Sequence, residues 1–223
     1  MTIVAVAITG GLTDSSEIAL HISSLWPREV TVIEADPDGG RLAARKDWPP
    51  RPGLVDLAAG SRTRSGVVGE HAHSIDTRRR VVVAPPAPEA VIAAIRLLTA
   101  SNSRLDEQLG TDVLLDVGRL RPESPALALL QRADRRVLVV RRDAEDVVAT
   151  MHRRPLLESV GDWSILTAGG RYPIDEVRSV LQWPIAADLL PSNKREAGAL
   201  RSAIIQMAHD SRRLEVLATS EVA

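Results

Sequence analysis

The chain of 223 residues contains no cysteine and no phenylalanine. Without cysteine it can form no disulfide bond, no thiol nucleophile and no thiolate metal site. Aromatic residues make up only 2% of the sequence, so the core must consist of Val, Leu, Ile and Ala. No apolar run approaches the ~20 residues of a membrane-spanning helix, and no charged and then apolar leader is present. These absences predict a cytoplasmic protein with no membrane span.

An excess of charge of either sign is also lacking. The formal net charge is −1, so bulk electrostatics favour neither nucleic acid nor an anionic membrane. Arginines at 78–80 and 141–142 could contact DNA phosphates without sequence specificity, but a solvated charged face is the better interpretation. The length suits one domain. We expect a single domain over residues 1–213 and a C-terminal tail, 214–223, that frays.

Short β-branched runs alternate along the chain with longer runs rich in Ala and Leu. Strands are expected at 2–8, 29–34, 80–84, 111–116, 136–141, 163–167 and 184–188. Helices are expected at 14–26, 86–100, 124–132, 143–158, 173–181 and 194–212. This alternation predicts a three-layer α/β/α domain with a mostly parallel sheet, whose ligands bind at the carboxyl ends of the strands. Residues 36–79 interrupt the rhythm as a long irregular excursion with a short helix near 54–59.

The turn after the first strand lacks a lysine. Residues 10–17 read Gly-Gly-Leu-Thr-Asp-Ser-Ser-Glu between a strand and a helix, which is the setting of a phosphate-binding loop. Such a loop binds through backbone N–H groups, the helix dipole and a lysine, yet no Lys or Arg precedes Arg28. Asp14 is the expected N-cap, with Glu17 completing a capping box. Its carboxylate would use the N–H groups that a phosphate needs and would repel the phosphate.

Acidic residues follow two other strands. Glu34-Ala-Asp-Pro-Asp-Gly-Gly40 comes after the second strand, where carboxylates can hold Mg²⁺ or orient a water molecule; a polar turn is the alternative. The fourth strand ends in Asp116, as in a Walker B segment, whose aspartate lies near the metal. The turns at 167–173 and 187–193 can line a purine pocket or simply reverse the chain.

These stretches together resemble the MinD/ParA group of deviant Walker A ATPases, which have a SIMIBI-type P-loop NTPase fold. They are most similar to the actinobacterial branch of short ParA-like proteins, often linked with Tad-type pilus or secretion systems. The resemblance covers nearly the whole chain. The segments that carry it are Glu34–Gly40 with Leu42-Ala-Ala, Pro52-Gly-Leu54, Val83–Pro86, Leu115–Arg119, Ala133–Arg141, and Gly170–Pro173 before Glu176-Val177.

The resemblance implies a set of site residues. Asp36 falls at the switch I acid that would position the attacking water, if the protein is active. Around a bound nucleotide, the implied phosphate-loop residues are Gly10, Gly11, Thr13, Ser15 and Ser16, the residues near the base are Arg171 and Pro191, and the Mg²⁺ site is formed by Asp36, Asp38 and Asp116.

The departures from the family pattern matter more. The family's loop carries a signature lysine that reaches across the dimer and a second lysine before the Thr pair. Thr9 and Leu12 stand at about those places, in a loop that is shortened. Losing a preorganised donor of this kind commonly costs on the order of 10²–10³ in rate. Arg41 or Arg45 of the switch segment could compensate.

Three functions remain open. The first is a ParA/MinD-like protein with weak or lost ATPase activity and no cofactor, acting as a scaffold or positioning factor for a DNA-segregation, pilus, secretion or conjugation machine. The second is an active ATPase that binds ATP and Mg²⁺ and dimerises on the nucleotide. The third is a different α/β protein whose acids and glycines imitate the set. We expect protein partners, in a homodimer or a hetero-complex.

Overall fold

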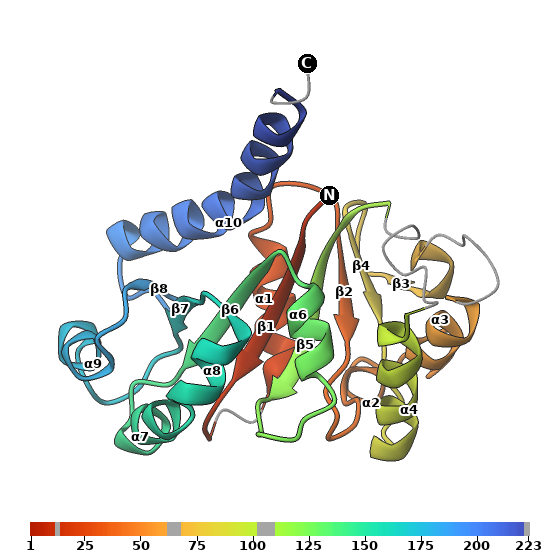
Figure 1. Cartoon of the computed structure of the whole chain (residues 1–223), viewed down its shortest axis with the longest axis horizontal. Helices are drawn as coiled ribbons and strands as arrows, with labels where there is room; N and C mark the ends of the chain where they lie inside the picture. Colours follow the sequence, from red (N-terminus) through yellow and green to blue (C-terminus); the bar gives the residue numbers. More distant parts are fainter. Residues whose placement is uncertain (12–13, 62–67, 102–109, 221–223) are drawn as a thin grey trace.

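The computed structural model describes residues 1–11, 14–61, 68–101 and 110–220, with side chains up to His209. Its eight strands form one sheet in the order β3-β4-β2-β5-β1-β6-β7-β8 (Figure 1). All neighbouring strands run parallel except β3 and β4. The strands are β1 Ile3–Ile8, β2 Val30–Glu34, β3 His73–Ser74, β4 Arg79–Val82, β5 Asp112–Arg119, β6 Arg135–Val140, β7 Ser164–Thr167 and β8 Ile185–Asp188.

Helices cover both faces of this sheet. Alternate residues of β1 point to opposite faces, so Ala5 and Ala7 join one core and Val4 and Val6 the other. The second of these cores is covered by α1 Ser15–Ser24, α2 Leu42–Arg45 and α10 Lys194–Ser220. The first is covered by α3 Leu54–Gly60, α4 Pro88–Thr99, α6 Leu127–Arg132, α7 Ala144–His152, α8 Arg154–Val160 and α9 Ile174–Leu181. The expected three-layer α/β/α architecture is confirmed.

Three segments differ from the sequence prediction. The expected helix 143–158 is two helices, which meet at Arg153. Pro155, in the first turn of α8, has no N–H to donate to the carbonyl of Met151, and its ring crowds that carbonyl, so α7 cannot continue through this point. The excursion is more regular than expected, since it contains α2, the 3₁₀ turn Val68–His71 and β3. Helix α10 runs to Ser220, past the expected end at 212, through a stretch without Gly or Pro.

The chain leaves β1 and its neighbour β6 towards opposite faces of the sheet. The chain leaves β1 into α1 on one face of the sheet, whereas it leaves the neighbouring strand β6 into α7 on the other face (Figure 1). In open parallel sheets, such a divergence at the carboxyl ends of adjacent strands is where ligands bind. Within the described part of the chain, no helix is both long and apolar enough to span a membrane.

Candidate functional site at the carboxyl edge of the sheet

A fully buried carboxyl group, that of Asp116 on β5, forms the centre of the site. The Ser16 hydroxyl donates to its Oδ2 at 2.5 Å, and the Gly118 N–H donates to its Oδ1 at 3.0 Å. Burial raises the pKa of Asp116 to about 7, although the hydroxyl groups of Ser16 and Ser15 oppose the shift; the charge of nearby Asp36 adds to it. Near neutral pH this group is therefore partly protonated.

Glu34, at the end of β2, is an acid for which the motifs indicate no individual role. It is fully buried, and four donor groups lie within hydrogen-bond distance of its carboxylate. Three are the backbone N–H groups of Arg41 at 2.7 Å, Leu42 at 3.1 Å and Ala84 at 2.9 Å. The fourth is the hydroxyl of Ser16 at 3.0 Å, which shares its one hydrogen between Glu34 and Asp116. Glu34 thus joins β2 to the segment after β4 and to the start of α2, and its carboxylate is saturated by the protein itself.

Asp36 lies near enough to both Asp116 and Asp38 for their charges to interact, since the charge of Asp36 adds to the raised pKa of Asp116 and that of Asp38 adds to the raised pKa of Asp36. Half-buried Asp36 packs against Gly118, where the backbone has φ +65° and where a Cβ would lie 2.7 Å from Asp36 Oδ2. Burial, above all, raises the pKa of Asp36. Exposed Asp38 instead pairs with Arg121 at 2.7 Å. Among the residues that the structure describes, no group of three or more His, Cys, Asp or Glu side chains is arranged to hold a metal ion.

Asp14 caps α1, as the sequence predicts, and its carboxylate accepts the N–H of Glu17 at 3.2 Å. The same carboxylate forms an ion pair with Arg45 of α2, and the Glu17 carboxylate pairs with Lys46 at 2.8 Å. Arg45, one of the two candidate compensating cations, therefore reaches this site. Its charge is matched there by an aspartate.

Two adjacent serines follow Asp14 at the start of α1. Ser15 and Ser16 both hydrogen-bond to Asp116. In phosphate loops the lysine directly precedes the serine or threonine that faces the metal site, and the residue directly before this serine pair is Asp14. Leu12 and Thr13 lie outside the described residues.

The glycine turn contacts a residue that no motif singled out. Gly11 N–H donates to Oδ1 of Asp146 at 2.5 Å, and Asp146 belongs to the first turn of α7. The side chain is only 2% exposed. The sequence contained little to mark Asp146 as a site residue, since an aspartate in the first turn of a helix is common. The strand order is needed to place Asp146 beside the turn.

Arg171 and Pro191, the two residues expected near a nucleotide base, have different surroundings. Arg171 is exposed, and its backbone N–H donates to Asp143 at 2.9 Å. Pro191 borders a hollow of about 340 Å³ between α1 and α10, together with His21 and Lys194. Buried Asp188, at the end of β8, is held by Arg142 at 2.8 Å.

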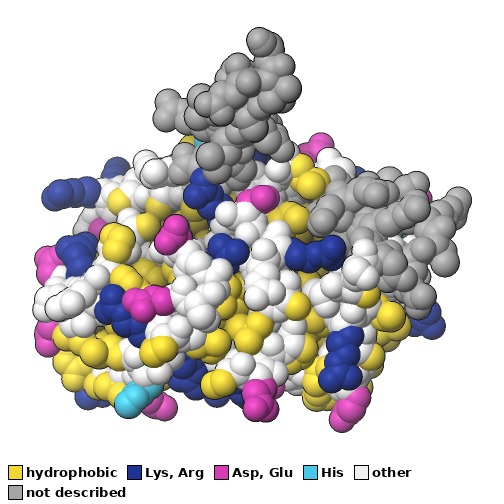
Figure 2. All heavy atoms as spheres, in the orientation of Figure 1, with side chains coloured by type: hydrophobic (Ala, Val, Ile, Leu, Met, Phe, Trp, Pro, Cys, Tyr) yellow, Lys and Arg dark blue, Asp and Glu magenta, His cyan; other side chains and the backbone are white. Residues whose placement is uncertain are grey.

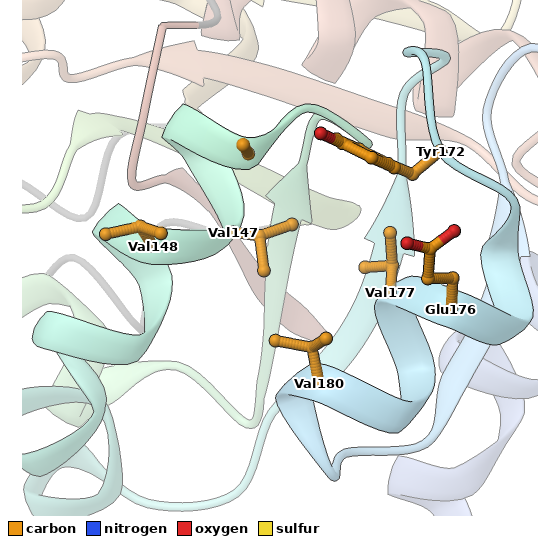
Figure 3. A pocket seen from close by; sticks show the side chains of 7 residues that line it. Val147, Val148, Tyr172, Glu176, Val177 and Val180 are labelled. Carbon is orange, nitrogen blue, oxygen red and sulfur yellow. The ribbon is translucent and has the colours of Figure 1, made fainter.

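An apolar groove of about 230 Å³ lies between α7 and α9 (Figure 3). Hydrophobic side chains gather on this part of the surface in Figure 2. Val148 and Val180 are 49% and 44% exposed, and Val147 points from α7 into the groove. The lining residues are Ala144, Val147, Val148, Tyr172, Glu176, Val177 and Val180.

The Asp14 cap can be tested by its contribution to stability. Asp14→Ala removes the cap, so we expect the free energy of unfolding in urea to fall by ~1 kcal/mol. Asp14→Asn keeps a capping oxygen and loses only the partly exposed pair with Arg45, so the loss should be a few tenths of a kcal/mol. An equal loss in both variants would contradict the capping role.

The raised pKa of Asp116 predicts a pH-dependent stability. Between the ordinary value of 3.8 and about 7, the folded protein retains a proton that the unfolded chain has released. Stability from this group is thus complete below pH 4 and is lost as pH rises through 7. The Asp116→Asn variant has no carboxyl group to deprotonate at this position and therefore does not lose this stability. In EDTA at pH 8 its free energy of unfolding should exceed that of the wild type by roughly 2–4 kcal/mol.

The gap between Asp116→Asn and the wild type should close as pH falls to 4. The exposed acid Asp175, which pairs with Arg178, supplies a control: Asp175→Asn should leave the pH dependence of the wild type unchanged. Parallel stability curves for wild type and Asp116→Asn from pH 4 to 8 would show that the pKa is not raised.

Comparisons with known proteins identify the fold. No family model matches the chain, and no curated protein matches it in sequence. A ParA family ATPase from Chlorobium tepidum matches with a TM-score of 0.67 at 14% identity, over 92% of this chain and 90% of that one. The cell division ATPase MinD of Pyrococcus furiosus matches with a TM-score of 0.65 at 17% identity, over 94% and 91%.

A chain of the MinC:MinD cell division protein complex from Aquifex aeolicus also matches, with a TM-score of 0.57 at 14% identity over 95% of this chain and 89% of that one. At such low identities the likeness establishes the fold alone. The mostly parallel eight-stranded sheet with helices on both faces is the P-loop NTPase fold of the ParA and MinD ATPases.

Proposed function

We propose that this chain is a ParA/MinD-like protein with weak or lost ATPase activity that acts as a scaffold or positioning factor. The machine it serves would be one for DNA segregation, pilus assembly, secretion or conjugation. The observation that carries the proposal is the carboxylate of Asp14, which caps α1 directly before the serine pair; a phosphate loop carries its lysine before that serine or threonine. The ParA/MinD fold supports the family assignment, and the site supports the loss of activity.

Two backbone donors of the described part of the loop already have partners within the protein. Gly11 N–H is bonded to Asp146, and Glu17 N–H to Asp14. A phosphate would also meet both carboxylates. Two unit charges 4 Å apart repel by about 4 kcal/mol at the effective dielectric constant of a protein surface. That repulsion exceeds the ~0.3–2 kcal/mol that a helix dipole offers an anion.

The carboxyl groups do not fit a magnesium ion either. Asp116 is partly protonated near neutral pH and is bonded to Ser16, and Glu34 accepts three backbone N–H groups and shares the Ser16 hydroxyl with Asp116. A magnesium site requires ionised oxygen ligands with free lone pairs. We therefore propose that the protein works without ATP and Mg²⁺, and that its partners are proteins, in a homodimer or a hetero-complex. The MinC:MinD complex is one example of a chain with this fold bound to another protein.

One observation favours an active ATPase as the second candidate. Arg45 reaches the N-terminus of α1, where a phosphate-binding cation is needed. If Asp14 moved away, Arg45 would remain as a cation beside the turn. In that case Asp36 would position the attacking water, with Mg²⁺ near Asp116 and Asp38 and the base near Arg171 and Pro191.

Titration of the purified protein with ATP and Mg²⁺ separates the two candidates. For the wild type we expect no binding heat at micromolar ATP and no phosphate release above background, because the site repels the triphosphate. Asp36→Ala serves as the matched control, since any release that survives this change comes from a contaminating enzyme. Micromolar binding with turnover that depends on Asp36 would overturn the scaffold proposal.

A further inference from the structure

The topology brings the first turn of α7 against the turn that follows β1. Strands β1 and β6 are neighbours, with Ile8 paired to Val139, so the residues after each strand emerge side by side (Figure 1). The chain after β1 forms the turn Thr9–Gly11, and the chain after β6 enters α7, which carries Asp146. The contact between them is therefore fixed by the pairing of two central strands rather than by a surface loop.

The Asp146 carboxylate fits into this turn only because the turn is made of glycine. A Cβ at Gly10 would lie 2.8 Å from Asp146 Oδ2 and nearer still to Oδ1, and one at Gly11 would lie 3.3 Å from Oδ1. The Gly11 N–H donates to Oδ1 at 2.5 Å. A close approach of glycine backbone to an anion, with the N–H directed at it, is the arrangement by which such turns bind phosphate.

A pair of threonines fixes α7 in this position. The Thr150 hydroxyl donates its hydrogen to the backbone carbonyl of Asp146 at 2.8 Å. Its oxygen lies 2.5 Å from that of Thr9, so Thr9 must be the donor of that second bond. Both threonines are buried. The end of β1 and the first turns of α7 are thus joined by hydroxyl bonds next to the carboxylate.

The second oxygen of Asp146 is not explained by helix packing. Oδ2 is buried and has no hydrogen-bond partner among the residues that the structure describes. A buried acceptor without a donor costs about 1–3 kcal/mol, and a serine or alanine would pack there without that cost. No Lys or Arg occurs in the loop sequence. The attraction for this carboxylate therefore comes from the N–H of the turn and the positive end of the α1 dipole.

We infer that the turn Thr9–Gly11 is an oxyanion site that the carboxylate of Asp146 occupies, so that α7 closes it to phosphate-class ligands. The inference rests on the proposed function, because it gives a second reason, besides Asp14, why the site takes no nucleotide. Asp146 is a positioning and blocking residue, with no part in catalysis. The helix that carries it also forms a wall of the apolar groove, through Val147 and Val148 (Figure 3).

Binding of inorganic pyrophosphate, measured by calorimetry with Mg²⁺ present, tests the inference. Asp146→Ser empties the turn and removes a charge, so we expect it to bind pyrophosphate at least about tenfold more tightly than the wild type. Glu145→Gln is the matched control, because Glu145 is an exposed acid of the same helical turn; its affinity should equal that of the wild type. A folded Asp146→Ser protein with no gain, or an equal gain in Glu145→Gln, would overturn the inference.

A measurement on the wild type keeps the inference testable if Asp146→Ser does not fold. In the protein without ligand, the Gly11 amide should exchange its hydrogen slowly in an NMR experiment, because it donates to Asp146. Exchange at the rate of an unprotected amide would overturn the inference. These outcomes are distinct from those of the ATP titration, since turnover by the wild type would refute the scaffold proposal whatever pyrophosphate does.

Discussion

A helix that begins directly after a glycine turn concentrates free N–H groups and positive partial charge at one point. In this protein that point is held by carboxylates of the chain itself. Asp14 caps the helix from within the loop, and Asp146 enters the turn from α7. Both supply the negative charge that a phosphate would otherwise bring. The remaining features of the site are consistent with an edge of the sheet that is stabilised internally rather than by a ligand.

The buried acids Asp116 and Glu34 are likewise hydrogen-bonded to donors of the protein itself. The Ser16 hydroxyl lies between Asp116 and Glu34 and shares its one hydrogen between them. Glu34 also accepts N–H groups from the start of α2 and from the segment after β4. Helix α2 in turn places Arg45 on Asp14. The segment that would act as a switch is thereby fixed to α1 by ion pairs and to β2 by hydrogen bonds. Such a connected network favours one arrangement of the site.

The sequence predicted the local features of this site and missed the ones that depend on strand order. The cap at Asp14 and the strand that ends in Asp116 follow from spacing and residue type within one element. The break between α7 and α8 could also have been predicted locally, because Pro155 has no N–H to continue the hydrogen bonds of a helix. Asp146 was not, because only the pairing of β6 with β1 places it at the glycine turn. The two-residue strand β3 is too short for a periodic signal, and the contact of Arg45 with Asp14 depends on how the excursion folds back.

The central claim is that the chain's own carboxylates fill the phosphate position at the start of α1. A crystal structure of the wild-type protein grown with ATP and Mg²⁺ tests it most directly. The account predicts electron density for the Asp146 side chain at Gly10 and Gly11, with Asp14 capping α1 and no phosphoryl group between them. Ordered β- and γ-phosphoryl groups against the glycine turn, with Asp146 displaced, would contradict it.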